Sequence, residues 1–277
     1  MALVRTGYEQ VFEEIHAGSC AFGRASILPW DTETFGFPVA AYQTGVAELD
    51  PAQRRDFPPR FDAWMRRNEI ALCVCTIPAN DRFWKLYLPE LNFRFVDFGL
   101  KAALNGLQTA TLPHARAALR PARPEDYETI EALAAQSFRH GRYHADPLFP
   151  RELADLRYRH WMRRALSGDN PIDHVYVLGE TGSVQGFYHV TIEGTLSDLR
   201  LMAVVPKLQA TGLGFHLCLS VLHLLRDLGV RRVVTSISGA NTAAMNVYSK
   251  LGFVFSDAEA IYHWHKLASG ARFSVPR

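Results

Sequence analysis

Cysteine is scarce in this sequence, with four residues in a chain of 277. None of the four lies in the C-x-x-C spacing of a metal-binding knuckle, and four residues are too few for the disulfide framework of a small secreted domain. Cys73 and Cys75 alternate within an apolar run, which is typical of a buried strand. We therefore expect reduced cysteines and a cytoplasmic protein.

Long hydrophobic runs are also missing. Residues 1–21 carry three glutamates and a histidine, which is unlike a secretory signal peptide. The most apolar stretch, Leu213–Val230, is interrupted by His216, His223, Arg226 and Asp227. This stretch predicts a buried helix and not a membrane span, so we expect no membrane partner.

The chain has no excess of charge of one sign. Its 30 Lys and Arg residues and 28 Asp and Glu residues give a formal net charge of +2. Because nucleic-acid-binding proteins usually present a clustered basic face, we expect no nucleic-acid partner. A hydrophobic content of 48% and this chain length predict a globular protein of one large or two modest domains.

Helical and strand patterns alternate in the second half of the chain, which predicts an α/β fold. The first expected helix begins near Pro124. The others span Pro150–Leu166, Gly214–Leu228 and Thr242–Leu251. The expected strands of one sheet are Ala117–Pro121, His174–Gly179, Val184–Ile192, Leu196–Val205, Arg231–Ser238, Phe253–Phe255 and Ala260–His265. Residues 269–277 are expected to be a loose tail.

A short internal repeat links the two halves. Ala79, Asn80 and Tyr87 match Ala240, Asn241 and Tyr248 at a constant offset, and Phe93 matches Phe253 after a shift of one residue. Four matched positions can arise by chance, but each copy follows an apolar strand. This shared context favours duplication, with a boundary between Asn105 and His114.

The strongest motif joins a strand to a helix and consists of Gln209-Ala210-Thr211-Gly212-Leu213-Gly214. Glycines in such a turn let backbone N–H groups converge, and the helix N-terminus adds further donors, which suits a pyrophosphate. Two glycines alone also fit a plain turn. A dinucleotide fingerprint requires a third glycine where Leu217 stands, and a P-loop requires Gly-Lys-Ser/Thr where Phe215 and His216 follow.

The order strand, Q-x-x-G-x-G, helix, strand, and then Asn241 and Tyr248 seven residues apart resembles the GCN5-related N-acetyltransferase (GNAT) superfamily. Leu119–Asp126 resembles the opening of that domain. The resemblance implies a GNAT fold, which is a mixed, mostly antiparallel sheet flanked by helices. It implies a degenerate, cofactor-free GNAT-like domain at 1–108, a catalytic GNAT domain at 114–268 and the tail at 269–277.

The same resemblance implies acetyl-CoA as co-substrate, a primary amine of a small molecule as acceptor, and no metal. The cofactor-binding positions that it assigns are Met202, Val204, Gln209, Ala210, Thr211, Gly212, Leu213, Gly214, Asn241 and Tyr248. One departure is the pair Ala210-Thr211, where relatives more often carry an Arg-Gly or Arg-Lys type pair. Asn241 also suits a plain helix cap. Asp50–Asp56 in the first half lacks glycine, so we expect coenzyme A to bind only the second half.

Three residues are candidates for proton transfer. The resemblance assigns Tyr248 as the acid that protonates the leaving thiolate, and a phenol is protonated at neutral pH. Asp198 and His189 are candidate bases, and a water chain is an alternative to both. For each residue the structural alternative is packing or a polar contact with the backbone.

A narrower resemblance is to bacterial TDP-fucosamine acetyltransferases, carried by Trp30–Pro38, Arg142–Pro147, Tyr158 and Trp161. It implies a nucleotide-linked amino sugar as acceptor. The candidate substrate-binding residues are Arg139, His140, Arg142, Tyr143 and His144. Their charge suits phosphates, although a solvated loop would look the same. These histidines form no i, i+4 pair with a carboxylate, so a metal is not expected.

Other acceptors stay open, namely an aminoglycoside, an amino acid or a peptide amine. A non-catalytic coenzyme A-binding regulator with the same fold is the alternative from another class. The oligomeric state is also open, with a homodimer among the possibilities.

Overall fold

The computed structural model of the chain describes residues 11–17, 20–45, 50–114 and 117–266. None of the helices in this part of the chain is long and apolar enough to cross a membrane. The residues form two compact units, neither of which is continuous in sequence. The first unit lies within Met1–Phe98, Arg142–Leu153 and Ala258–Arg277, and the second within Gly99–Gly141 and Ala154–Asp257. The tail expected at 269–277 falls outside the described residues.

Five strands follow one another in the sheet of the first unit. They are β1 (Glu13–Ala17), β2 (Cys20–Ile27), β3 (Val39–Thr44), β4 (Leu72–Pro78) and residues 259–265 of β11 (Val254–His265). Neighbours are antiparallel at β1–β2, β2–β3 and β4–β11, and parallel at β3–β4. Cys73 and Cys75 of β4 are fully buried, which confirms the prediction made from their alternation.

Four helices belong to the first unit: α1 (Pro29–Phe35), α2 (Pro51–Arg67), α3 (Arg82–Glu90) and α5 (Arg142–Ala145). The long helix α2 begins with a capping box in which Asp50 and Gln53 satisfy each other's backbone N–H groups. Phe57 and Phe61 of α2 and Trp84 of α3 are buried in one core with the sheet. The shorter α1 and α5 lie outside this core cluster.

The sheet of the second unit repeats the strand directions of the first. In spatial order its strands are β6 (Leu119–Pro121), β7 (Asp173–Leu178), β8 (Gly186–Glu193), β9 (Leu196–Val204), β10 (Arg232–Ser238) and residues 99–105 of β5 (Arg94–Asn105). Only the β9–β10 pair is parallel. The predicted mixed, mostly antiparallel sheet is therefore confirmed.

The C-terminal strand differs from its prediction. The sequence predicts two short strands, Phe253–Phe255 and Ala260–His265, in the sheet of the second half. The structure has one strand, β11, and its residues 259–265 pair with β4 of the first unit. In the second unit, residues 99–105 of β5 lie beside β10. The sequence analysis names no pairing partner for these strands, because alternating hydrophobicity identifies a strand without saying which strand it pairs with.

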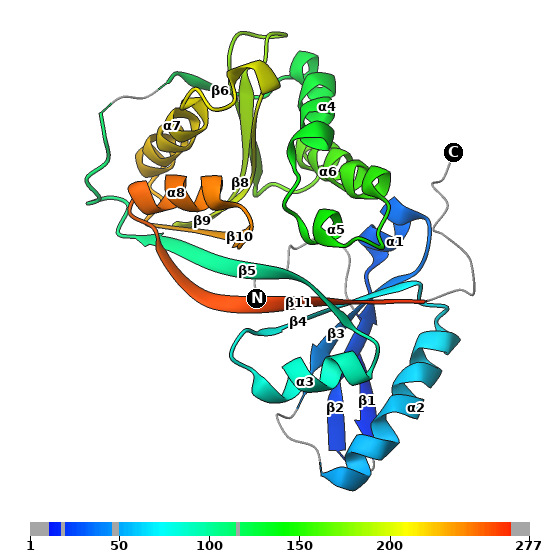
Figure 1. The fold of residues 1–277 in the computed structure, drawn as a ribbon. Coiled ribbons are helices and arrows are strands. Elements are labelled where there is room, and N and C mark those ends of the chain that lie inside the picture. The colour runs from blue at the N-terminus through cyan, green and yellow to red at the C-terminus, as the bar shows by residue number, and fades with distance from the viewer. Residues whose placement is uncertain (1–10, 18–19, 46–49, 115–116, 267–277) are drawn as a thin grey trace. The chain divides into compact units, whose positions relative to one another are not determined.

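Helices cover both faces of the second sheet (Figure 1). α4 (Tyr127–Ser137) and α6 (Arg151–Leu166) lie on one face, and α7 (Leu213–Asp227) and α8 (Thr242–Lys250) lie on the other. Each face has its own apolar core, with Ile130 and Met162 in one and Leu217 and Leu222 in the other. The apolar stretch that the sequence predicts as a buried helix is α7.

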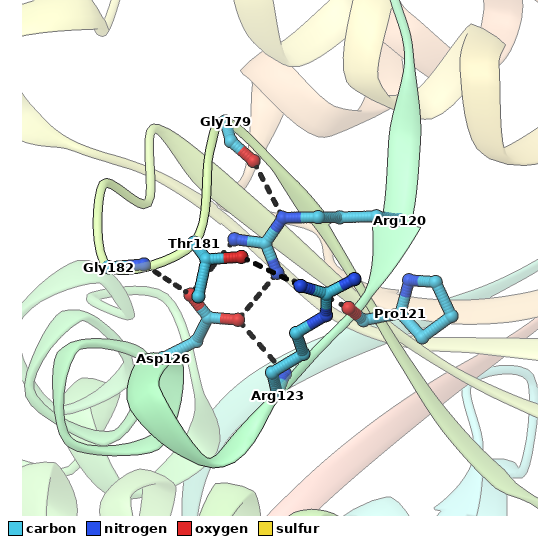
Figure 2. Close-up of polar contacts among 7 residues, drawn as sticks. All are labelled: Arg120, Pro121, Arg123, Asp126, Gly179, Thr181 and Gly182. Carbon is cyan, nitrogen blue, oxygen red and sulfur yellow. Dashed lines mark hydrogen bonds and ion pairs between the residues drawn. The ribbon is translucent and has the colours of Figure 1, made fainter.

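A buried carboxylate holds the first strand and the first helical turn of this unit in place (Figure 2). Asp126 ends the short 3-10 turn Pro124–Asp126, and its oxygens accept from the Arg120 guanidinium at 2.6 and 2.9 Å. They also accept from the backbone N–H groups of Arg123 and Gly182, at 2.9 and 3.1 Å. The hydrogen bonds from Arg120 hold the pKa of this carboxyl well below its usual range. Asp126 thereby ties the helix start expected after Arg123 to the β7–β8 turn.

Candidate active site

β9 and β10 pair over only part of their lengths. Their parallel register covers four residue pairs and ends at Thr235 and Leu199, where the Thr235 hydroxyl donates to the Leu199 carbonyl at 2.9 Å. β9 continues to Val204 without β10 beside it in the described register. The backbone of Met202 and Val204, two predicted cofactor-binding residues, lies in this segment. Its edge can therefore accept an extended ligand in place of a strand.

A β-bulge sits where the two strands part. His189 pairs with Leu201 and Val190 pairs with Leu199, so Arg200 of β9 is an extra residue. The insertion reverses the alternation of β9, because Leu199 joins the core beneath α7 whereas Leu201 joins the core beneath α4 and α6. A bulge also leaves backbone groups without a ladder partner. This segment can therefore direct N–H groups at a ligand carbonyl.

The glycine-containing loop follows β9 directly. After the 3-10 turn Pro206–Leu208, Ala210 and Gly212 both adopt positive φ angles, 61° and 86°. No side chain caps the N-terminus of α7 among the described residues. A Cβ built at Gly212 would meet no atom within 4 Å. The loop is thus open at the helix N-terminus, as an anion site requires.

The other predicted loop residues hold the loop in shape. The Gln209 side-chain amide donates to the Val204 carbonyl at 3.2 Å, and the Thr211 hydroxyl donates to the Leu208 carbonyl at 2.7 Å. A Cβ at Gly214 would lie 3.6 Å from the Met202 side chain, which is ordinary contact. Gly212, with its left-handed backbone, is therefore the glycine that the turn requires most strictly.

Tyr248 projects from α8 into the α7 face of the sheet. Asn241 caps this helix by accepting from the Ala244 N–H at 3.1 Å, which is the structural role weighed for it. The Tyr248 hydroxyl lies 3.0 Å from that of Tyr188. Burial raises the pKa of Tyr248, and hydrogen bonding with Tyr188 and Thr235 opposes the rise. The phenol is therefore protonated at neutral pH, as a proton donor must be.

Tyr188 is a site residue that the sequence analysis misses. It lies on β8 with 1% of its surface exposed, and its hydroxyl also lies 3.8 Å from the Cys218 sulfur. Burial raises the pKa of Tyr188 well above the usual value and that of Cys218 to about 12. No local motif marks Tyr188, because its proximity to Tyr248 arises only when β8 lies beneath α8.

Asp198 lies on β9 just before the point where the strands part. Its side chain is 17% exposed and contacts Arg200, with 3.2 Å between the carboxylate oxygen and the guanidinium nitrogen. Burial raises the pKa of Asp198 to about 6, and the charge of Arg200 limits the rise. Asp198 is therefore ionised at neutral pH but holds a proton more readily than an ordinary aspartate.

His189 is more enclosed than Asp198. Its side chain is 2% exposed, and its Nε2 lies 2.8 Å from an oxygen of Asp173 on β7. Burial lowers the pKa of His189 although Asp173 opposes the change. Its Nδ1 is buried and has no hydrogen-bond partner within the described chain. The enclosed ring is less able than Asp198 to reach an external amine.

The two candidate proton-transfer groups occupy opposite faces of the sheet. Asp198 precedes Leu199, whose side chain lies beneath α7, so Asp198 points toward the face of α4 and α6. Tyr248 lies on the α7 face beside Thr235. The charge of Asp198 nevertheless contributes to the raised pKa of Tyr248. A ligand held where β9 and β10 part would thus have a base on one side and an acid on the other.

The predicted substrate-binding residues divide between the two units. In the second unit, Arg139 pairs with Asp155 at 3.2 Å, and His140 is exposed. Arg142, Tyr143 and His144 belong to the first unit.

The guanidinium of Arg142 lies 5.1 Å from the Tyr143 ring centre, and His144 is half-buried. The Tyr143 hydroxyl lies 2.8 Å from an oxygen of the buried Asp31, and Phe35 packs edge-on against the Tyr143 ring. The two segments behind the narrower resemblance, Trp30–Pro38 and Arg142–Pro147, therefore pack against each other within the first unit.

Comparison with known proteins relates the second half of the chain to one family. Residues 128–253 match the Acetyltransferase (GNAT) family. Over 145 residues the chain is 29% identical to the spore coat polysaccharide biosynthesis protein SpsD of Bacillus subtilis (strain 168), covering 52% of this chain and 50% of that protein. Over 109 residues it is 28% identical to the mycothiol acetyltransferase of Rhodococcus opacus (strain B4), covering 37% of this chain and 34% of that protein. The chain thus spans half or less of these relatives.

Two solved structures show the same fold at low identity. A GCN5-related N-acetyltransferase from Sphaerobacter thermophilus has a TM-score of 0.61 at 14% identity, over 88% of this chain and 77% of its own. A tandem GNAT protein from the clavulanic acid biosynthesis pathway has a TM-score of 0.57 at 16% identity, over 92% of this chain and 82% of its own. The predicted GNAT fold with a preceding GNAT-like half is confirmed.

Proposed function

Because this chain carries a domain of the acetyltransferase (GNAT) family over residues 128–253, we propose that it transfers an acetyl or other short acyl group from acyl-CoA to a primary amine of a small molecule. The observation that carries the proposal is that β9 and β10 stop pairing after Leu199 and Thr235, between the loop at Gly212 and the buried Tyr248. An elongated thioester with a pyrophosphate at one end suits such a site.

The residues present fit coenzyme A. The backbone of β9 at Met202 and Val204 would pair with the amides of the pantetheine arm, beside the Gln209 amide that donates to the Val204 carbonyl. The N–H groups around Gly212 and the first turn of α7 would hold the pyrophosphate. Ala210-Thr211 offers no charged side chain, so binding would rest on backbone donors. The first half, where Asp50 caps α2, is proposed to bind no coenzyme A.

Asp198 is the proposed proton acceptor for the attacking amine. A substrate ammonium must lose a proton before its nitrogen can attack, and a carboxylate with a pKa of about 6 can take that proton directly or through one water. His189 is the second choice because its ring is more enclosed. Backbone N–H groups at the Arg200 bulge would polarise the thioester carbonyl as negative charge develops on its oxygen.

Tyr248 is the proposed proton donor to the leaving thiolate, and Tyr188 is proposed to assist it. Once Tyr248 has given up its proton, a phenolate remains in a buried site, which is unfavourable without a donor. Tyr188 is the more deeply buried of the pair, 1% exposed against 7%, so it is the poorer phenolate and the natural hydrogen-bond donor. Transfer to the thiolate would thus leave the charge hydrogen-bonded.

A nucleotide-linked amino sugar is the proposed acceptor. The similarity to SpsD, a spore coat polysaccharide biosynthesis protein, supports a sugar substrate. Arg139 and the exposed His140 could approach phosphates. The mycothiol acetyltransferases among the relatives support instead an acceptor related to mycothiol. An aminoglycoside, an amino acid and a peptide amine remain further candidates.

A screen of amines with acetyl-CoA, followed by detection of free thiol, tests the proposal. Nucleotide-linked amino sugars, aminoglycosides, amino acids and peptides form the panel, and Tyr248→Phe is the matched control. Amine-dependent thiol release by the wild-type chain supports an acetyltransferase and identifies the acceptor class. Saturable coenzyme A binding without thiol release from any amine would favour the non-catalytic regulator.

A further inference from the structure

Two histidines of β11 share one face of the strand. His263 and His265 are two residues apart, and residues with this spacing point the same way from a strand. Tyr262 and Trp264, which alternate with them, pack with the core of the first unit. Both histidines are buried, at 0% and 8% exposure. Sequence reasoning that looks for helical i, i+4 ligand pairs does not detect this arrangement.

Asp146 brings a carboxylate to both rings. One of its oxygens, Oδ2, lies 2.7 Å from His263 Nδ1 and 2.6 Å from His265 Nε2. The other oxygen, Oδ1, accepts from the Leu148 N–H at 2.9 Å, which fixes the side chain just beyond α5. Asp146 is itself 4% exposed. All three residues belong to the first unit.

From this geometry we infer that Asp146, His263 and His265 bind one divalent transition-metal ion, with zinc as the preferred ion. Each residue offers a ligand atom, and the three atoms lie within 4.8 Å of one another. Zinc bonds to imidazole nitrogen and carboxylate oxygen are about 2.0–2.2 Å long, so tetrahedral donors lie roughly 3–3.5 Å apart. To admit the ion, the two contacts to Asp146 need to widen by about half an ångström, and the two imidazole nitrogens need to come to a similar spacing.

The surroundings of the triad suit a preorganised site. The Tyr143 ring lies 5.5 Å from the His263 ring and 5.0 Å from that of Phe149, between centres. The Tyr143 hydroxyl lies at hydrogen-bond distance, 2.8 Å, from Asp31. Aromatic packing of this kind restricts the rotamers of the ligand side chains. Two imidazoles and a carboxylate are a ligand set that zinc commonly takes, with a fourth position for water.

The charge of Asp146 also calls for a cation. Its side chain forms no ion pair with Arg or Lys among the described residues, and it contacts the two imidazoles and one N–H group. Buried carboxylates are normally paired with a cation or bound to a metal. The alternative is a metal-free network in which each ring donates one N–H to Asp146. The bound ion would join Arg142–Leu153 to β11 inside the first unit, a structural role independent of acyl transfer.

Metal binding by the full-length chain tests this inference. The protein is stripped with EDTA, dialysed and titrated with zinc chloride in a calorimeter, with magnesium chloride as the comparison. Cobalt(II) then serves as a spectroscopic substitute for zinc. We expect one zinc per chain, no saturable magnesium binding, a raised melting temperature with zinc, and cobalt bands without thiolate charge transfer.

Asp146→Asn and His265→Gln should each abolish stoichiometric zinc binding. His16→Gln should not, and it is the matched control because His16 forms an exposed pair with Glu14 in the same unit, at 3.1 Å. Absence of zinc binding by the wild-type chain would overturn the inference and leave the metal-free network. Unchanged binding in the folded triad variants would also overturn it. If neither variant folds, a cobalt–thiolate band in the wild type would place the metal on cysteine and refute the triad.

Discussion

Two helices, α3 in the first half and α8 in the second, share their length, cap and ending but differ at the position of the proposed acid. Each has nine residues, follows an apolar strand and is capped by a side-chain oxygen at the residue before it, Asp81 or Asn241. Each is followed by a left-handed residue, Asn92 with φ 64° or Gly252 with φ 85°. The local frame is therefore the same in both copies.

This shared frame corrects the repeat drawn from sequence. The N–H of Phe253 donates to the carbonyl of Tyr248, whereas the N–H of Phe93 donates to that of Leu88. Leu88, fully buried, is thus the counterpart of Tyr248, and Tyr87 lies one residue earlier. The Tyr87 hydroxyl instead donates to the Arg54 carbonyl at 3.0 Å. The first half has kept the helix but has no phenol at the position proposed for the acid.

The connection that leads into α2 in the first half also differs from the one that leads into α7 in the second half. At the start of α2, Asp50 accepts from the N–H groups of Ala52 and Gln53, so the donors that could hold an anion are already used. At the start of α7, Gly212 brings no side chain and no cap. If the second half carries the proposed site, the first half therefore lacks two of its features, the phenol on the helix and the open helix N-terminus.

Replacement of the proposed acid should give the largest effect. Tyr248→Phe should lower kcat by roughly 10²–10⁴-fold and leave acetyl-CoA affinity nearly unchanged, because the proton matters mainly as charge develops on sulfur. Steady-state kinetics and calorimetry measure the two quantities. Tyr87→Phe is the matched control in the first half and should leave kcat within about twofold of wild type. Equal losses at both positions would remove the distinction between the halves.

Asp198→Asn should lower kcat/KM by about 10²-fold at neutral pH. In the wild type, kcat/KM should fall as the pH drops through about 6, because Asp198 must be ionised to accept a proton. The variant should lose this fall of kcat/KM at low pH.

The stability of Asp198→Asn at neutral pH should not fall. A carboxyl whose pKa is raised on folding stabilises the fold at low pH and loses that contribution as the pH rises through about 6. If kcat/KM of Asp198→Asn still falls as the pH drops through about 6, another group is the base, and His189 would be the next candidate to test.

Gly212→Val should raise KM for acetyl-CoA by about tenfold to a hundredfold. A β-branched residue at φ 86° is strained by roughly 1–2 kcal/mol, and relief of that strain would distort the anion site. Asp50→Ala removes the cap of the corresponding helix in the first half and should leave this KM unchanged. An unaltered KM in a folded Gly212→Val protein would show that the loop does not contribute to cofactor binding.

The smallest effect is expected at Tyr188. Tyr188→Phe should lower kcat by about tenfold, because one hydrogen bond to a buried charge contributes about 1.5–3 kcal/mol. Tyr42 is the control: it is a buried tyrosine of the first half, and its hydroxyl donates to the Phe22 carbonyl at 3.0 Å. Tyr42→Phe should change stability and not kcat. If Tyr188→Phe keeps the full kcat and an unchanged pH–rate profile, Tyr188 is a packing residue.

The sequence predicts local features of the second half well. Its helices and strands form within a few residues of the predicted bounds, because period, caps and glycine turns are local signals. The narrower motifs at Trp30–Pro38 and Arg142–Pro147 are also recognisable as sequence. That they meet through Tyr143 and Asp31 is a long-range contact, which no local pattern encodes.

What the sequence could not supply is pairing between distant segments. The partner of β11 is β4, and the bulge at Arg200 appears only when β8 and β9 are set in register. Tyr188 and the Asp146 triad likewise depend on residues 60 and 117–119 positions away. The candidate acid and base were accessible from local context and family resemblance, whereas the residues that support them were not.

Calorimetric titration of the full-length chain with coenzyme A tests the central claim, that one half alone retains an acyl-CoA site. The account predicts a stoichiometry of one per chain. It also predicts that Gly212→Val weakens this binding and that Asp50→Ala does not. Two sites per chain, or a single site that is weakened by Asp50→Ala and insensitive to Gly212→Val, would contradict it.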